Sequence, residues 1–150
     1  MGPGASAKLF AVYSLGLVAL LADVRHQLGA GNGTLVDGGV TTTLPLARRL
    51  ILSATATMTW TDARYARAYF GVDANQSRAA LAYGQALRTF SAGAGLRDAA
   101  LALAAIVPID PRWSVHALFR GEFLLGDAAS SPLTGSRVQP MFGGFLAYRL

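Results

Sequence analysis

The amino-acid sequence predicts an all-β fold: an antiparallel transmembrane β-barrel of about seven to eight strands, whole or incomplete. Three observations predict it. The 150-residue chain is 53% hydrophobic and only 14% charged, yet it contains no run of about 20 apolar residues that would span a membrane as a helix. Apolar and polar residues alternate in several segments, and short turns alternate with long loops.

The clearest alternation lies in residues 49–62, RLILSATATMTWTD. Leucine, alanine, methionine and tryptophan occupy every second position, and the positions between them from Ser53 to Thr61 carry hydroxyl groups. A period of two indicates a strand with one apolar and one polar face. In a membrane barrel the apolar face meets lipid, whereas in a soluble sandwich it meets the core.

Turn signals delimit the other strands. The predicted strands, in order, are 7–14, 17–27, 34–44, 49–62, 91–107, 113–125 and 139–150. Their connections are short (15–16), medium (28–33), short (45–48), long (62–90), short (108–112) and long (126–137). Outer-membrane barrels alternate short periplasmic turns with long outer loops in this way.

The aromatic residues agree with two membrane interfaces. Tyr13, Trp113 and Tyr148 lie on apolar faces beside short turns or the C-terminus, whereas Trp60 and Phe123 lie beside long loops. We therefore expect two interfacial girdles. The alternative is that these residues are ordinary core aromatics.

The polar faces predict a charged lumen. His116, Arg120 and Glu122 share one face of strand 113–125, where Arg120 and Glu122 are close enough to pair. In the same register, Asp23, Arg25, Asp37 and Asp98 also face the lumen. The cluster is interpreted either as a solute filter or acid–base pair, or as structural ion pairs in a filled interior, which we favour.

No catalytic, cofactor or metal site is predicted. Ser114 lies beside His116, but a nucleophile elbow is missing and Glu122 is too far along the strand to orient the imidazole. The two histidines lie on different strands and opposite faces, without metal-ligand spacing. The arginines are scattered, which argues against nucleic acid. Those of the loop 62–90 are expected either to bind lipopolysaccharide phosphate or a partner, or to be solvated.

Seven strands are an odd number, whereas bacterial single-chain barrels usually have an even one. Two explanations are open: an eighth strand lies within 62–90, or the chain is the C-terminal part of a longer barrel. We expect residues 1–150 to form a single barrel domain that is truncated at its N-terminus.

Several stretches carry a family resemblance: YFGVDANQSRAA (69–80), SAGAGLRDAAL (91–101), DPRWSV (110–115), LLGDAASSPL (124–133) and the closing AYRL. Together with DVRHQLG (23–29) and TLPL (43–46), they make the chain similar to the MipA/OmpV family of Gram-negative outer-membrane proteins. The family usually ends in Phe, whereas this chain ends in Leu150.

The resemblance implies an outer-membrane barrel without enzymatic activity, in contact with outer-membrane lipid and lipopolysaccharide. It also implies a scaffold that links a lytic transglycosylase to a penicillin-binding murein synthase. Two other functions are left open, a small-solute channel and a soluble lipocalin-like binding barrel.

Overall fold

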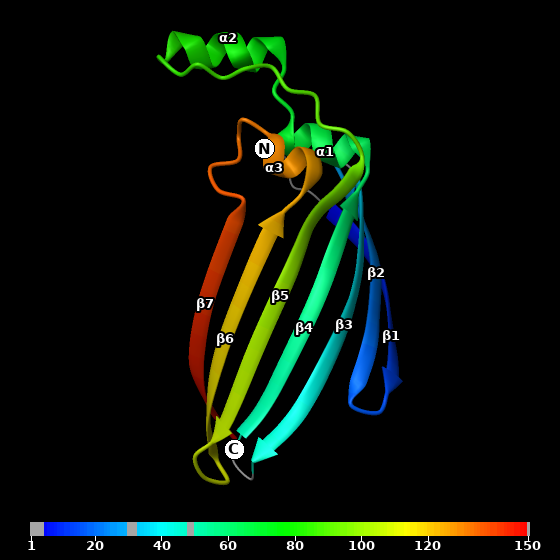
Figure 1. The fold of residues 1–150 in the computed structure, drawn as a ribbon, viewed down its shortest axis with the longest axis vertical. Helices are drawn as coiled ribbons and strands as arrows, with labels where there is room; N and C mark the ends of the chain where they lie inside the picture. The colour runs from blue at the N-terminus through cyan, green and yellow to red at the C-terminus, as the bar shows by residue number, and fades with distance from the viewer. Residues whose placement is uncertain (1–4, 30–32, 48–49, 150) are drawn as a thin grey trace.

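A computed structural model describes residues 5–29, 33–47 and 50–149, and its main element is one antiparallel sheet (Figure 1). Its strands are β1 (Ala5–Leu15), β2 (Val18–Leu28), β3 (Gly33–Ala47), β4 (Leu50–Thr61), β5 (Gly95–Pro108), β6 (Trp113–Leu124) and β7 (Val138–Tyr148). The seven strands lie in sequence order, and each pairs only with its neighbours in the chain. The all-β antiparallel prediction is confirmed, and the sheet is not closed. Predicted loop, turn and strand positions at 30–32, 48–49 and 150 lie outside the described residues.

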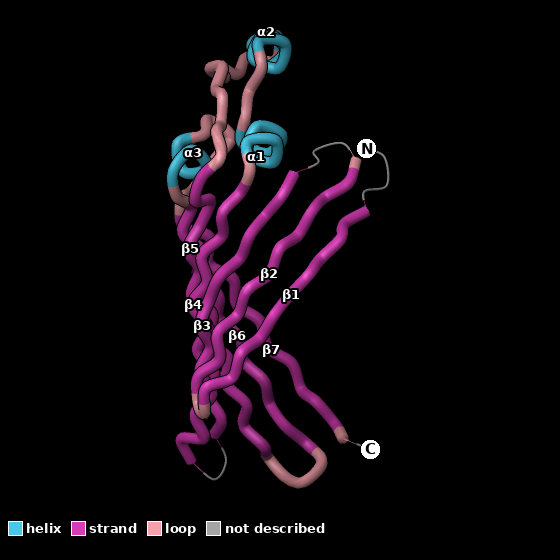
Figure 2. The backbone as a smooth tube through the Cα atoms, turned by 90° about the vertical axis from the view of Figure 1, so that its right-hand side faces the viewer, coloured by secondary structure: helices cyan, strands magenta, loops and turns pink. Residues whose placement is uncertain are grey.

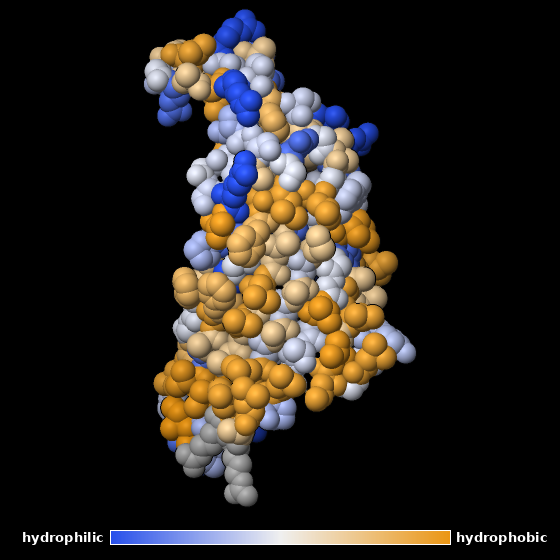
Figure 3. Space-filling model, in the orientation of Figure 1, coloured by the Kyte–Doolittle hydropathy of each residue, from blue (hydrophilic) through white to orange (hydrophobic). Residues whose placement is uncertain are grey.

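The sheet is curved into a trough, as Figure 2 shows, with β1, β2 and β7 bending toward the same side. Its convex face is the one seen in Figure 3, where hydrophobic side chains cover the strands and hydrophilic ones gather at the end that carries the helices. β1 and β7 form the two edges of this sheet.

Alternation along each strand separates the two faces. In β4, Met58 and Trp60 are 48% and 40% exposed, whereas Thr59 and Thr61 are 3% and 2% exposed. β2 alternates in the same way at each of its positions. Because directly paired residues of an antiparallel sheet share a face, the threonines of β4 identify the inner, concave face.

The predicted long loops contain helices: α1 (Ala63–Phe70) and α2 (Ala74–Ala82) follow β4, and α3 (Gly126–Ser130) follows β6. Of the two explanations left open for the odd strand number, the structure rules out an eighth strand within 62–90, since the only extended pairing described there is a single bridge between Val72 and Phe90. Strand β5 begins at Gly95, later than the predicted residue 91. Among the described residues, no helix is both long enough and apolar enough to cross a membrane.

Each of the first two helices begins at an aspartate. The Asp62 carboxylate accepts a hydrogen bond from the Tyr65 amide, and Asp73 forms a reciprocal capping box with Gln76. Such caps satisfy amides that have no partner within the helix. The two helices pack differently against the rest of the chain: α1 contacts β3, whereas α2 buries none of its residues.

Helix α1 covers the concave side of the sheet at the helix-bearing end (Figure 2). Tyr65 and Ala66 are 8% and 3% exposed, and Leu35 at the start of β3 is 1% exposed. Gly33 admits this contact, because a Cβ atom there would lie 2.6 Å from the Cβ of Tyr65. The small apolar core of the described chain is therefore concentrated at this end.

Candidate functional site

The strand register places a row of polar side chains across the concave face, toward its helix-bearing end. Asp23 of β2 is opposite Asp37 of β3, Asp37 is opposite Thr59 of β4, and Thr59 is opposite Asp98 of β5. The Thr59 hydroxyl lies 2.6 Å from Asp37 Oδ1 and 3.1 Å from Asp98 Oδ1. It carries one proton, so it donates to one carboxylate at a time.

Basic side chains separate the carboxylates at the β1 side of this row. Lys8 Nζ lies 3.2 Å from Asp23 Oδ2, and Arg25 Nη2 lies 3.2 Å from Asp37 Oδ2 and 3.7 Å from Asp23 Oδ1. Three strands are thus joined by ion pairs between adjacent side chains on one face.

A β-bulge continues the row toward β6. The register between β4 and β5 shifts at Thr59 and Trp60, which are opposite Asp98 and Leu96. The shift leaves Arg97 as an extra residue, as in a bulge, and its guanidinium contacts the fully buried Asp98 carboxylate. Arg97 also lies 3.8 Å from Glu122, which lies 3.3 Å from Arg120.

These contacts form two ion-pair clusters, one across β1, β2 and β3 and the other across β5 and β6, with the Thr59 hydroxyl of β4 between them; the whole row is called the ion-pair ladder. Its cations are Lys8, Arg25, Arg97 and Arg120, and its anions are Asp23, Asp37, Asp98 and Glu122. With all groups ionised the formal charges cancel, +4 against −4. Pairing matters most at Asp98, since a buried charge without a partner is costly.

Helix α1 is attached to the same ladder through its tyrosines. Tyr65 and Tyr69 stack with their ring centroids 4.3 Å apart. The Arg97 guanidinium donates to the Tyr65 hydroxyl at 3.2 Å, and the Tyr69 hydroxyl donates to Gln27 at 3.0 Å. The ladder and the helix above it therefore form one connected polar structure.

The N-cap of α1 has a shifted pKa. Burial raises the pKa of the Asp62 carboxyl, but hydrogen bonds from the backbone amides of Tyr65 and Thr34 outweigh burial and leave the pKa below its usual value. The amide donors lie 2.8 and 2.9 Å from the carboxylate oxygens. Since Thr34 belongs to β3, the same carboxylate starts the helix and holds it to the sheet.

His116 lies apart from the ladder. Its Nε2 atom is 2.9 Å from Ser114 Oγ, and its ring stacks on Phe145 with centroids 4.5 Å apart. The two residues line a cavity of about 500 Å³ at the short-turn end. Asp110 lines the same cavity, but its Oδ1 atom accepts hydrogen bonds from the amides of Arg112 and Trp113. The serine–histidine pair thus has no carboxylate orienting it among the described residues.

Sequence reasoning missed three members of this site, Lys8, Arg97 and Tyr65, and it placed Thr59 on the polar face without giving it a role. Simple alternation places Arg97 on the face opposite to Asp98, and only the bulge brings both inward. Tyr65 falls in the predicted loop 62–90, whereas the structure places it in α1. Within the described ranges, no three His, Cys, Asp or Glu side chains are arranged to hold a metal ion.

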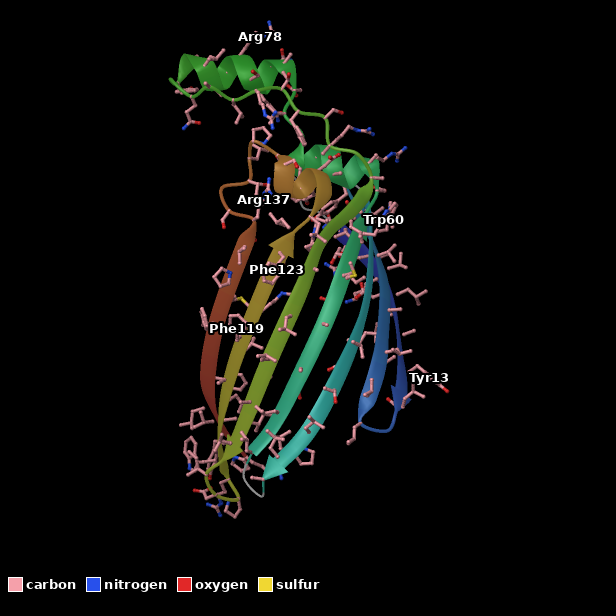
Figure 4. The ribbon with its side chains drawn as sticks, in the orientation of Figure 1. Tyr13, Trp60, Arg78, Phe119, Phe123 and Arg137 are labelled. Carbon is pink, nitrogen blue, oxygen red and sulfur yellow. The ribbon has the colours of Figure 1, made fainter. Side chains whose placement is uncertain are left out.

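The predicted girdle residues point outward at two levels. Trp60 and Phe123 lie toward the helix-bearing end, and Tyr13 lies toward the short turns (Figure 4). All three are at least 40% exposed. At the short-turn end, the rings of Trp113 and Tyr148 are 4.8 Å apart.

Comparison with curated protein sequences found no match. Comparison with protein families matched residues 1–150 to the family described as MipA, MltA-interacting protein MipA. This match covers the sheet, the helices and the ion-pair ladder together. The protein therefore belongs to the MipA family.

Proposed function

We propose that the chain forms the wall of an outer-membrane barrel with a filled interior, and that it serves as a structural scaffold for murein enzymes. The observation that carries the proposal is the neutral ion-pair ladder, whose ion pairs span β1 to β3 and β5 to β6 with Thr59 of β4 between them, and whose Arg97 is bonded to Tyr65 of α1. Ionic side chains that satisfy one another hold neighbouring strands together and leave no single-sign charge to select a solute.

A small-solute channel is the second candidate, favoured by the polar concave face. A water-filled pore needs an open polar interior, whereas here Arg97 and Tyr65 join the wall to the covering helix. The chain reconstituted in planar bilayers, beside a known porin, is expected to give no steady current. Reproducible single-channel steps would favour the channel over the filled scaffold.

A soluble lipocalin-like barrel would place its apolar side chains inside. Against this, Leu101, Leu103 and Phe123 on the convex face are 42%, 44% and 49% exposed. Spin labels at positions 52 and 57 of β4 test the orientation in lipid vesicles. A lipid-soluble quencher should reach 52 and not 57, and the reverse result would contradict a membrane barrel.

The scaffold's enzyme partner is expected at the short-turn end, because short turns of outer-membrane barrels face the periplasm, where murein lies. Arg112 and Arg149 are exposed there and are held together by a hydrogen bond of 2.8 Å from the Arg149 amide to the Arg112 carbonyl. The family description names an interaction with MltA. We therefore propose that a lytic transglycosylase of this kind docks at this end.

The test is capture of a purified MltA-type lytic transglycosylase by the chain in detergent micelles. The Arg112→Glu/Arg149→Glu variant should lose capture, because the reversed charges repel the acidic surface that arginines attract. Arg78→Glu is the matched control, since Arg78 lies on α2 at the opposite end (Figure 4). Equal capture by all three chains, or none by the unaltered chain, would contradict the proposed docking end or the scaffold role.

A further inference from the structure

Two arginines from distant parts of the chain meet at the C-terminal end of α3. Arg88 Nη2 donates to the Ser130 carbonyl at 3.2 Å, and Arg137 Nε donates to the Ala129 carbonyl at 3.2 Å. The accepting residues are consecutive, and one turn of helix rises only about 5.4 Å. Both side chains therefore bond to adjacent carbonyls at the same end of the helix.

Capping the helix leaves most of their hydrogen-bonding capacity unused. A guanidinium has about five N–H donors, and α3 takes one from each arginine. Both side chains are exposed, and no carboxylate of the described residues lies within ion-pair distance of either one. Asp127 of the same helix instead accepts from the Gly93 amide at 2.7 Å. The pair is suited to an anion with several oxygens, which arginine forks bind in a bidentate manner.

Apolar surface begins directly beside these cations. Phe123 of β6 and Val138 of β7 are paired at the end of their strands, and they are 49% and 47% exposed on the convex face. Arg137 immediately precedes Val138, and its carbonyl accepts from the Leu124 amide at 2.8 Å. Figure 4 places Arg137 closer to the helix-bearing end than Phe123. In Figure 3, hydrophilic side chains border the apolar band at the same level.

We propose that Arg88 and Arg137 bind a phosphate of lipopolysaccharide, with its acyl chains lying along the convex face of β6 and β7. The inference rests on the proposed function, which places the helix-bearing end in the outer leaflet. Cations bordered by exposed apolar side chains complement a phosphorylated lipid. A free phosphate ion has no apolar group that would contact the exposed apolar side chains beside the arginines.

Binding of fluorescently labelled lipopolysaccharide to the full chain in micelles, followed by anisotropy, tests the site. The Arg88→Gln/Arg137→Gln variant should bind about a hundredfold more weakly, since the charge-assisted bonds of each arginine contribute roughly a factor of ten. Arg88→Lys/Arg137→Lys keeps the charges but loses the forks, so it should show an intermediate loss. Arg112→Gln/Arg149→Gln, at the opposite end, is the control and should bind normally.

Three competitors identify the ligand. Dephosphorylated lipopolysaccharide, inorganic phosphate and phosphatidylglycerol vesicles should each displace the probe poorly. Effective displacement by the dephosphorylated glycolipid, by phosphate alone or by phosphatidylglycerol would overturn the proposal, as would equal weakening in the control. Emission of the two tryptophans reports whether each variant is folded, and a variant that unfolds is replaced in the comparison by its lysine counterpart.

The two proposals fail separately. Lost lipopolysaccharide binding with retained membrane insertion and transglycosylase capture would overturn only the lipid site. A chain that neither inserts nor captures the enzyme would overturn the proposed function itself.

Discussion

Replacing Asp98 by Asn tests whether the ion-pair ladder stabilises the sheet. The Asp98 side chain is 0% exposed and contacts both Arg97 and Thr59. Asparagine keeps nearly the same volume and removes the charge, which leaves the Arg97 guanidinium with Glu122 at 3.8 Å. Breaking one side of a buried ion pair costs about 3–5 kcal/mol. Because Glu122 compensates in part, we expect a loss of about 3 kcal/mol in the free energy of unfolding.

The assay is urea unfolding of the refolded chain in detergent micelles, followed by the fluorescence of its two tryptophans. Asp37→Asn is the matched control, because Asp37 and its partner Arg25 are 20% and 37% exposed. A partly exposed pair contributes only about 0–1 kcal/mol, so the control should lose no more than that.

A double-mutant cycle completes the test. If Arg97 and Asp98 stabilise each other, removing both charges should cost about 1–3 kcal/mol less than the sum of the single losses. Additive losses, or a loss in Asp98→Asn no larger than that in Asp37→Asn, would refute the view that the buried pair holds β5 in the sheet.

Two further predictions concern the backbone around the site. Asp62→Ala should lower the free energy of unfolding by about 1–2 kcal/mol, because it removes the cap of α1 and an acceptor for β3. Asp73→Ala, which uncaps the unburied α2, should reduce helicity by circular dichroism with less than about 0.5 kcal/mol of global change; equal global losses would contradict this. The folded pKa of Asp62 is lowered, so its contribution is fully present above the ordinary carboxyl pKa of about 3.9 and is lost as the pH falls through the folded pKa. The difference between Asp62→Ala and the unaltered chain should accordingly shrink in acid. Gly39→Ala should cost about 1–3 kcal/mol in urea unfolding, since the added Cβ would lie 2.6 Å from the Ala56 carbonyl oxygen, while nothing lies within 4 Å of one at Gly38. Gly38→Ala is the control, and similar losses at both glycines would argue against a steric cause.

Strands were predictable because their signal is local. The predicted strand 49–62 corresponds to Leu50–Thr61, and 113–125 corresponds to Trp113–Leu124. Alternation also assigns Asp23, Asp37 and Glu122 to the polar faces of their strands. The polar row of Asp23 and Asp37 follows from that periodicity once the strand order is known.

The features that alternation missed depend on a helix cap, a β-bulge and the register between strands. Asp73 and Gln76 have the spacing of a capping box, which signals the start of a helix. The segment 62–90 has no sustained hydrophobic period, so alternation alone does not reveal this helix. Arg97 could not be placed from alternation, because its direction is set by a shift in the pairing of β4 with β5. Lys8 required the cross-strand register that brings β1 beside Asp23.

The edges of the sheet limit how it closes. Neighbouring strands are antiparallel through a sheet of seven strands, so β1 and β7 run in the same direction, from the helix-bearing end to the short turns (Figure 2). Direct pairing of these two edges would be parallel, and an all-antiparallel barrel requires an odd number of additional strands between them. Side chains near both edges are correspondingly exposed, with Phe10 at 70% and Phe145 at 63%.

This parity predicts the behaviour of the chain on a denaturing gel. Closed barrels have no unpaired edge, whereas here the edge strands offer free backbone groups for detergent and water to attack. The refolded 150-residue chain should therefore migrate alike with and without boiling, beside a closed eight-stranded barrel that shifts on boiling. A shift in this chain would mean that its edges do meet, through a parallel seam or between copies. Cross-linking at two protein concentrations then separates these two cases, because only contact between copies depends on concentration.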